Sequence, residues 1–426
     1  MIKKLLHSKV TKNAGWLILG KVAQMLISLV VGLLTARYLG PANYGLINYA
    51  NAYVAFFMAF CALGINSILV KEFLDNPADE GRIIGSTLVM RAISSFLSAG
   101  VIICIVGLLE HDEPTTIAVT ALCSIGLLFN IFETFNYWFQ SKLQSKITAI
   151  VSFVAYTVTA LYKILLLILN KSVEWFAFAN ALDYICVGVL LLFCYHKEGG
   201  GKLGFSKVAC KRILSKSVHF IFPSLMISIY GYADKIMLKQ MLSETEVGYY
   251  STATALCGMW CFILVAIIDS MTPSIMESYK IDYTNYEKKN RILYAIVFYI
   301  SIAASILFCV FGKPIIGILY GEQYLSAVEP LRIVTWYTAF SYLGVARNAW
   351  IVCENKQKYL KYIYVVAAIC NVILNYFFIP LWGTTGAAMA SLITQIITTM
   401  IVPFFISDLR RNSILMIEGI FFKDIR

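Results

Sequence analysis

Apolar runs long enough to cross a lipid bilayer follow one another along almost the whole chain, separated by short polar segments. An α-helix needs about 20 consecutive apolar residues to span the hydrocarbon core. By that measure the sequence predicts twelve spans, near residues 14–36, 44–70, 84–109, 115–138, 148–169, 173–195, 217–241, 247–275, 292–311, 331–352, 360–381 and 384–406. Hydrophobic residues make up 59% of the chain, charged residues make up 14%, and the mean hydropathy is +0.75. The chain is therefore predicted to be an all-α, multi-pass integral membrane protein.

The segments outside these spans are too short for a folded catalytic domain of ordinary size. The longest are 196–216, 276–291, 312–330 and the tail after residue 406. The sequence therefore predicts a protein that is not an enzyme.

The positive charges indicate how the chain is oriented, because Lys and Arg in short loops stay on the cytoplasmic side. With the N-terminus inside, most of the 35 Lys and Arg residues fall in inner segments, and the outer segments hold only Arg37, Lys171, Lys239 and Lys313. Both termini are therefore predicted to be cytoplasmic. The net charge of +11 is read as this topology signal together with an attraction to anionic membrane lipid, and no nucleic-acid partner is expected.

The residue types that usually hold metals or disulfides show no organised spacing. The 11 cysteines include no C-x-x-C pair, and the 4 histidines are scattered. No metal site and no cofactor are predicted.

The chain divides into two halves of six spans each. We expect an N-terminal lobe over 1–195, a basic cytoplasmic linker over 196–216, a C-terminal lobe over 217–406 and an amphipathic cytoplasmic tail over 407–426. The halves are weakly alike, because Gly45 and Ala50 after the first span match Gly248 and Ala253 after the seventh. Repeats of this kind are typical of transporters with a path between two lobes.

Several longer blocks resemble the bacterial O-antigen and capsular polysaccharide flippases, a family within the multidrug/oligosaccharidyl-lipid/polysaccharide exporter superfamily. The blocks are Arg37–Gly45, Lys71–Glu72, Tyr137–Gln140, Asp234–Leu238 followed by Glu246–Ser251, and Asn375–Ala388.

The resemblance implies a V-shaped bundle of two six-helix lobes in the bacterial cytoplasmic (inner) membrane. It also implies transport of an undecaprenyl-pyrophosphate-linked oligosaccharide from the inner to the outer leaflet by alternating access, for O-antigen, capsule or exopolysaccharide assembly. A polysaccharide polymerase and a chain-length regulator are the protein partners that it implies.

Charged side chains inside the predicted spans are the candidate functional residues, because a charge at the bilayer centre costs about 2.5–3.5 kcal/mol on insertion scales. The candidates for binding the diphosphate or sugars are Lys21, Arg91, Lys163, Lys235 and Arg347. The candidates for a coupling ion or for ion pairs are Glu133, Asp183, Asp234 and Asp269.

Each candidate also has a structural interpretation. Lys21, Arg91 and Arg347 lie near the cytoplasmic ends of their spans, where long side chains reach to the membrane surface. Lys163 and Asp183 are placed to neutralise one another, and Glu133 and Asp269 to pair with an inner arginine. Adjacent helical residues point about 100° apart, so at most one member of the Asp234–Lys235 pair is expected to face a central cavity directly.

Three other functions are weighed against the flippase. A multidrug exporter of the same superfamily carries mostly organic cations, which favour acidic pockets, and the Lys and Arg within the predicted spans argue against it. A polysaccharide polymerase or ligase usually places its chemistry on a large outer loop, which this chain lacks. A purely structural scaffold has no need of so many charges within its spans.

Overall fold

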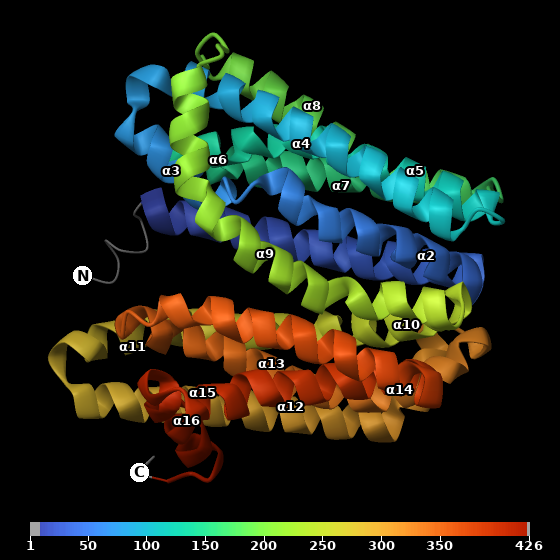
Figure 1. The fold of residues 1–426 in the computed structure, drawn as a ribbon, viewed down its shortest axis with the longest axis vertical. Helices are drawn as coiled ribbons and strands as arrows, with labels where there is room; N and C mark the ends of the chain where they lie inside the picture. Colours follow the sequence, from blue (N-terminus) through green and yellow to red (C-terminus); the bar gives the residue numbers. More distant parts are fainter. Residues whose placement is uncertain (1–8, 424–426) are drawn as a thin grey trace. The chain divides into compact units, whose positions relative to one another are not determined.

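The computed structural model describes residues 9–423, with side chains described for residue 24 and from residue 27 onward. Every regular element in that range is helical (Figure 1). Within it, nine helical segments are long and apolar enough to cross a membrane. The all-α membrane class predicted from the sequence is confirmed.

The twelve predicted spans all fall on helices. Two of the long apolar segments, Ile27–Asp75 and Gln357–Phe405, each overlap two predicted spans. In both, a glycine with positive φ ends one helical arm and starts the next: Gly40 (φ +72°) in α2 (Lys9–Ala62) and Gly383 (φ +56°) in α14 (Leu360–Ile396). Glycine adopts such angles at little cost because it has no Cβ. The span predicted at 331–352 forms α13 (Val328–Cys353).

The described chain forms two compact units. Met1–Leu39 and Leu46–Ser228 make up the first, and Gly40–Gly45 and Ile229–Arg426 make up the second. The basic stretch predicted as a linker at 196–216 belongs to the first unit, because the Gly204 N–H donates to the Gly81 carbonyl at 3.1 Å and residue 207 already begins a long helix. The change of unit therefore falls inside that helix, after residue 228.

The first unit packs its helices around an apolar core near one end of the bundle. Leu69, Phe135 and Tyr195 are fully buried in this core, and Trp138 is nearly so, with its indole N–H donating to Glu80 at 2.8 Å. Its helices after α2 are α3 (Asn66–Asp75), α4 (Glu80–Leu109), α5 (Pro114–Phe129), α6 (Glu133–Ser141), α7 (Ser145–Ile168), α8 (Val173–Lys197) and the first part of α9 (Lys207–Met241).

A buried carboxylate attaches the start of α9 to α3. Glu72 is 1% exposed and lies 3.0 Å from Nε of Arg212, and it also accepts a hydrogen bond from Lys216. A carboxylate removed from water needs such partners. These contacts hold the basic segment against the first unit.

The second unit has its core around α12 (Tyr283–Leu319) and α13. Tyr286, Tyr294 and Leu343 are fully buried there, and Trp350 is 2% exposed. The other elements are α10 (Glu244–Trp260), α11 (Phe262–Ile281), α14, a π-helical turn (Ile397–Ile401), α15 (Val402–Phe405) and α16 (Ser407–Ile420).

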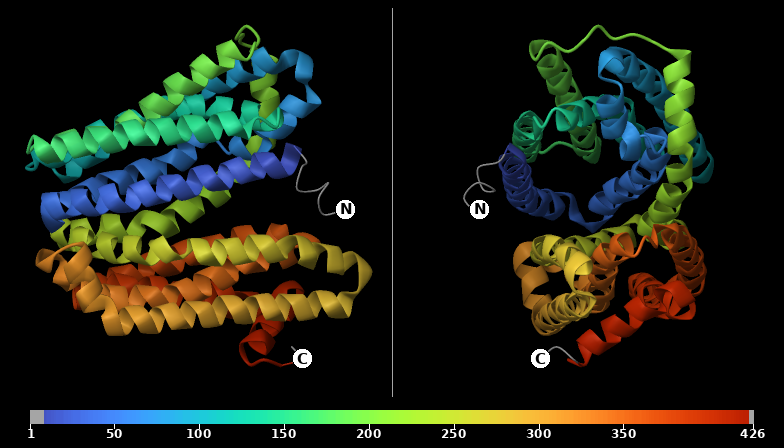
Figure 2. Two further views of the ribbon diagram at one scale, coloured as in Figure 1. Left: turned by 180° about the vertical axis from the view of Figure 1, so that it is seen from behind. Right: turned by 90° about the vertical axis from the view of Figure 1, so that its left-hand side faces the viewer.

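The C-terminal tail predicted as an amphipathic segment contains α16, which packs against α12 (Figure 2). Leu415 and Met416 are buried in the core of the second unit, and Glu418 accepts a hydrogen bond from Nε of Arg291 at 2.7 Å. Its apolar face is therefore covered by protein. The exposed apolar residues at its end are Phe421 and Phe422.

The matching glycines of the two halves meet in the second unit. A Cβ at Gly45 would lie 1.7 Å from the carbonyl oxygen of Glu244, and a Cβ at Gly248 would lie 2.1 Å from that of Pro41. No side chain fits at either position, so the backbones of Gly40–Gly45 and α10 are in direct contact.

We predict that Gly248→Ala lowers the free energy of unfolding by about 1–3 kcal/mol, because the added methyl group displaces the backbone at Pro41. The measurement is the melting temperature of the detergent-purified protein, with membrane abundance beside it. Gly100→Ala is the matched control, since Gly100 is an exposed mid-helix residue in α4 with open space around its Cβ. It is expected to gain about 0.5–1 kcal/mol from helix propensity. A Gly248→Ala protein as stable as the wild type would contradict the close crossing.

Candidate functional site

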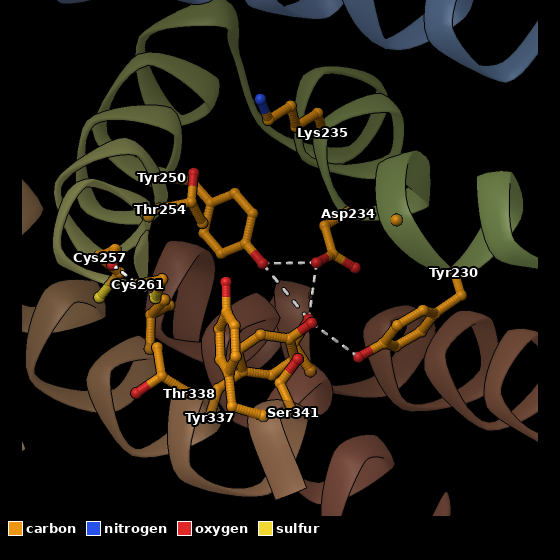
Figure 3. A pocket seen from close by; sticks show the side chains of 15 residues that line it. Tyr230, Asp234, Lys235, Tyr250, Thr254, Cys257, Cys261, Tyr337, Thr338 and Ser341 are labelled. Carbon is orange, nitrogen blue, oxygen red and sulfur yellow. Dashed lines mark hydrogen bonds between the residues drawn. The ribbon is translucent and has the colours of Figure 1, made fainter. Parts of the chain in front are cut away.

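The second unit contains a cavity of about 360 Å³ whose walls come from three helices (Figure 3). Its lining residues recur at helical spacing: 230, 231, 234 and 235 on α9; 250, 254, 257, 258 and 261 on α10; and 334, 337, 338, 341 and 342 on α13. Residues three or four apart lie on one helix face, so each helix turns a single stripe toward the cavity. Ser391 of α14 completes the lining.

At one wall of this cavity, the buried carboxylate of Asp234 accepts three hydrogen bonds. Asn375 Nδ2 donates to it at 2.6 Å, Ser391 Oγ donates at 2.7 Å, and the Tyr250 hydroxyl donates as well. Asp234 is only 5% exposed. Three donors stabilise this buried carboxylate, and Lys235 also acts on it electrostatically.

The hairpin at Gly383 places the donors of α14 around Asp234. Asn371 and Asn375 lie one turn apart on its first arm, and Ser391 lies on its second arm. The Asn375 amide also donates to Asn371 Oδ1 at 3.0 Å. Without the turn at Gly383, one straight helix could not present both arms to the same carboxylate.

Asp234 and Lys235 both line the cavity, but their side chains point apart (Figure 3). Asp234 turns to its donors and is buried, while Lys235 is half-buried. The two side chains diverge because neighbouring residues on a helix point about 100° apart.

A second polar chain crosses the cavity. The Tyr230 hydroxyl donates to Gln395 Oε1, and the Tyr337 hydroxyl lies 3.0 Å from the Tyr230 hydroxyl. Sequence reasoning did not single out Tyr230, Tyr337 or Ser391. The signal that could have found them is the recurrence of hydroxyl side chains at helical spacing within apolar spans.

The two buried arginines predicted to bind substrate lie within their own units. Arg91 is 1% exposed, and its guanidinium donates to the Asn66 side-chain oxygen in the first unit, with Glu133 near enough to act on it electrostatically. Arg347 is 5% exposed and donates to the Thr398 carbonyl at 3.5 Å, within the π-helical turn. A role for either arginine in substrate binding stays a prediction.

Lys163 lies in a polar cluster of the first unit. Its ammonium donates to Asn180 Oδ1 at 3.4 Å, and the Asn180 amide donates to Asn51 at 3.3 Å. Asp183 acts on Lys163 electrostatically, but among the described side chains no ion pair within 4.0 Å joins them. The direct Lys163–Asp183 ion pair considered from the sequence is therefore replaced by the contact between Lys163 and the amide oxygen of Asn180.

Among the candidates with described side chains, Glu133, Asp183 and Asp269 do not line the cavity. Asp269 is exposed on α11, and the side chain of Lys21 lies outside the described part of the chain. The coupling-ion role predicted for Glu133, Asp183, Asp234 and Asp269 stays a prediction.

Comparisons with known proteins agree with this architecture. Residues 10–279 match the model of the family described as "Polysaccharide biosynthesis protein". The capsular polysaccharide biosynthesis protein CapF of Staphylococcus aureus is 22% identical over 92% of this chain and 98% of its own length. A putative O-antigen transporter of Escherichia coli K12 is 20% identical over 95% of this chain and 98% of its own.

Solved structures share the fold. The lipid II flippase MurJ in an inward closed conformation superposes with a TM-score of 0.72 at 14% identity, covering 95% of this chain and 92% of that one. An inward-facing multidrug transporter of the MATE family gives a TM-score of 0.70 at 15% identity, covering 92% and 95%. With the family match spanning more than half of its length, this chain belongs to the polysaccharide biosynthesis protein family.

Proposed function

We propose that this protein is a flippase that moves undecaprenyl-pyrophosphate-linked oligosaccharide units from the inner to the outer leaflet of the bacterial cytoplasmic membrane. The observation that carries the proposal is a cavity lined by hydroxyl groups within a helical membrane chain of a polysaccharide biosynthesis family. Relatives named for capsule synthesis and O-antigen transport, and the shared fold of a lipid II flippase, support it.

The main energetic cost of this transport is moving the polar head of the substrate through the bilayer. Burying one hydroxyl without a hydrogen bond costs roughly 2–7 kcal/mol, and an ionised diphosphate costs far more. The lipid tail can stay in the bilayer while a polar cavity carries the head. Alternating access requires no bond to be made or broken, so the proposed activity is transport and not catalysis.

The main alternative is a multidrug exporter, because the fold is shared with that class. Organic cations bind to carboxylates that are free to receive them. Asp234, the carboxylate of this cavity, already accepts hydrogen bonds from Tyr250, Ser391 and Asn375. The flippase accounts better for a site that is rich in hydroxyls and has a compensated acid.

For the diphosphate we propose two separate contacts, Lys163 in the first unit and Lys235 in the second. Both are half-buried, whereas Arg91 and Arg347 are buried within their units. An ammonium on a flexible chain can follow a moving phosphate. A polysaccharide polymerase and a chain-length regulator are the partners that would receive the product on the outer side.

Deleting this protein is expected to make lipid-linked oligosaccharide accumulate on the inner leaflet, since the polar head cannot cross the bilayer unaided. The measurement is mass spectrometry of lipid extracts together with an assay of surface polysaccharide, in a strain with no other flippase. Restoring the intact gene is the control. Unchanged surface polysaccharide would refute the proposal, and a raised sensitivity to cationic dyes would favour the drug exporter.

Both termini are proposed to be cytoplasmic, because Lys and Arg concentrate in the segments that this orientation places inside. Reporter fusions at Asp112, Asn170 and Glu322 should then report the outer side. Fusions at Gly200 and Asp282 should report the inner side. Reversal at any two of the five positions would overturn this orientation.

Lys163→Gln and Lys235→Gln are expected to lower export about 10- to 100-fold at normal membrane abundance. The basis is the loss of a charge-assisted hydrogen bond worth about 1.5–3 kcal/mol. Complementation of the deletion strain measures export, and Lys→Arg variants, which keep the charge, serve as controls. Arg91→Gln and Arg347→Gln should instead reduce membrane abundance. Normal export by both Lys→Gln variants would exclude these lysines as diphosphate ligands.

A further inference from the structure

We propose that the cavity between α9, α10 and α13 is a binding subsite for one or two neutral sugar rings of the transported glycan. This inference rests on the proposed function and adds to it where the sugar end of the substrate is held. The subsite lies wholly within the second unit.

The size of the cavity suits a short piece of the glycan. Its volume of about 360 Å³ lies near the lower end of the range of about 300–1,000 Å³ that is typical of small-molecule sites. A lone cation or water molecule needs far less room. A whole lipid-linked unit needs more, so only part of the glycan would enter.

The hydroxyls of the lining are arranged to accept hydrogen bonds. Thr254 donates to the Ser251 carbonyl at 3.1 Å, Thr338 donates to the Thr335 carbonyl at 2.6 Å, and Tyr250 donates to Asp234. A hydroxyl that donates its only proton into the protein keeps its oxygen lone pairs for a ligand. Sugar hydroxyls bring their own protons and match such a surface.

The cavity also offers ring faces and apolar patches. Tyr230, Tyr337 and Tyr342 line it together with the sulfurs of Cys257 and Cys261. A sugar ring presents C–H groups on its faces and hydroxyls on its edge. Tyrosines, which pair a flat apolar body with a polar tip, provide for both.

The charges of the lining suit a neutral sugar next to the diphosphate. Lys235, which we propose as a diphosphate contact, also lines the cavity, and its side chain points away from Asp234 (Figure 3). Asp234 is the acid of the lining, and its oxygens are engaged by Asn375, Ser391 and Tyr250. A carboxylate that is compensated in this way offers little to an organic cation. It also does not repel a neutral sugar.

Two glycines keep one side of the cavity free of side chains. Gly231 on α9 and Gly258 on α10 both line it, both are exposed, and a Cβ at either would meet nothing within 4 Å. Glycine is unfavourable inside a helix, so local stability does not explain these positions. A larger side chain at either glycine would begin in open space beside the cavity.

The test therefore adds a large side chain beside the cavity at each of these two glycines. Gly258→Leu and Gly231→Leu are purified beside Gly100→Leu, whose glycine lies on an exposed apolar face of α4 with Phe96 and also has open space at its Cβ. Two probes are used in native mass spectrometry: undecaprenyl pyrophosphate, and the sugar-bearing lipid extracted from the deletion strain.

We expect the wild type to bind the sugar-bearing lipid more tightly than undecaprenyl pyrophosphate. Gly258→Leu and Gly231→Leu should weaken binding of the sugar-bearing lipid at least tenfold and weaken binding of undecaprenyl pyrophosphate by a smaller factor, because Lys235 is kept. Gly100→Leu should change neither. A Tyr230→Phe/Tyr337→Phe variant, which keeps the rings and removes two hydroxyls, should show a smaller loss confined to the sugar-bearing lipid.

The outcomes separate this inference from the proposed function. If the deletion strain accumulates the lipid and the wild type binds it, but both glycine variants bind it equally well, the subsite is wrong and the flippase stands. Equal wild-type affinity for the two probes would also exclude the subsite. If the deletion strain yields no lipid-linked sugar, the proposed function fails and the subsite fails with it.

Discussion

The organisation of the second unit depends on one buried carboxylate. Asp234 lies among helices that face hydrocarbon on their outer sides, where an unpaired charge is expensive. Its three donors come from α10 and from both arms of α14, so satisfying this one group fixes the relative positions of three helices. Tyr250 and Ser391 donate hydrogen bonds to Asp234 and also line the cavity. The same contacts therefore form part of the cavity wall.

Glycine provides the geometry that these contacts require. At Gly383 a positive φ turns α14 back on itself and brings Ser391 to the level of Asn371 and Asn375. At Gly45 and Gly248 the absence of a side chain lets two backbones touch. In a membrane, where the hydrophobic effect does not drive helices together, such close approach supplies much of the packing energy.

The charges within the spans are mostly accommodated by neutral polar partners. Arg91 bonds to Asn66, Lys163 to Asn180 and Arg347 to a backbone carbonyl. The number of cations and anions within the spans therefore does not show which charges are neutralised. An amide or carbonyl dipole next to a helix can partly stabilise a charge without a partner of opposite sign, and a sequence does not reveal which dipoles will lie nearby.

The sequence by itself determined the helical membrane class, the positions of the apolar spans and the family, because hydrophobic runs and local glycine and proline motifs are properties of contiguous residues. It also marked Asp234, through the motif in which it stands and its burial within an apolar run. The tertiary structure alone decided the rest. Asn375 and Ser391 are 141 and 157 residues from Asp234, and Tyr337 is 107 residues from Tyr230, so no local pattern could pair them. Which side of a span faces a neighbouring helix, a cavity or lipid depends on how separate helices pack, and that is set by contacts between residues far apart in the chain.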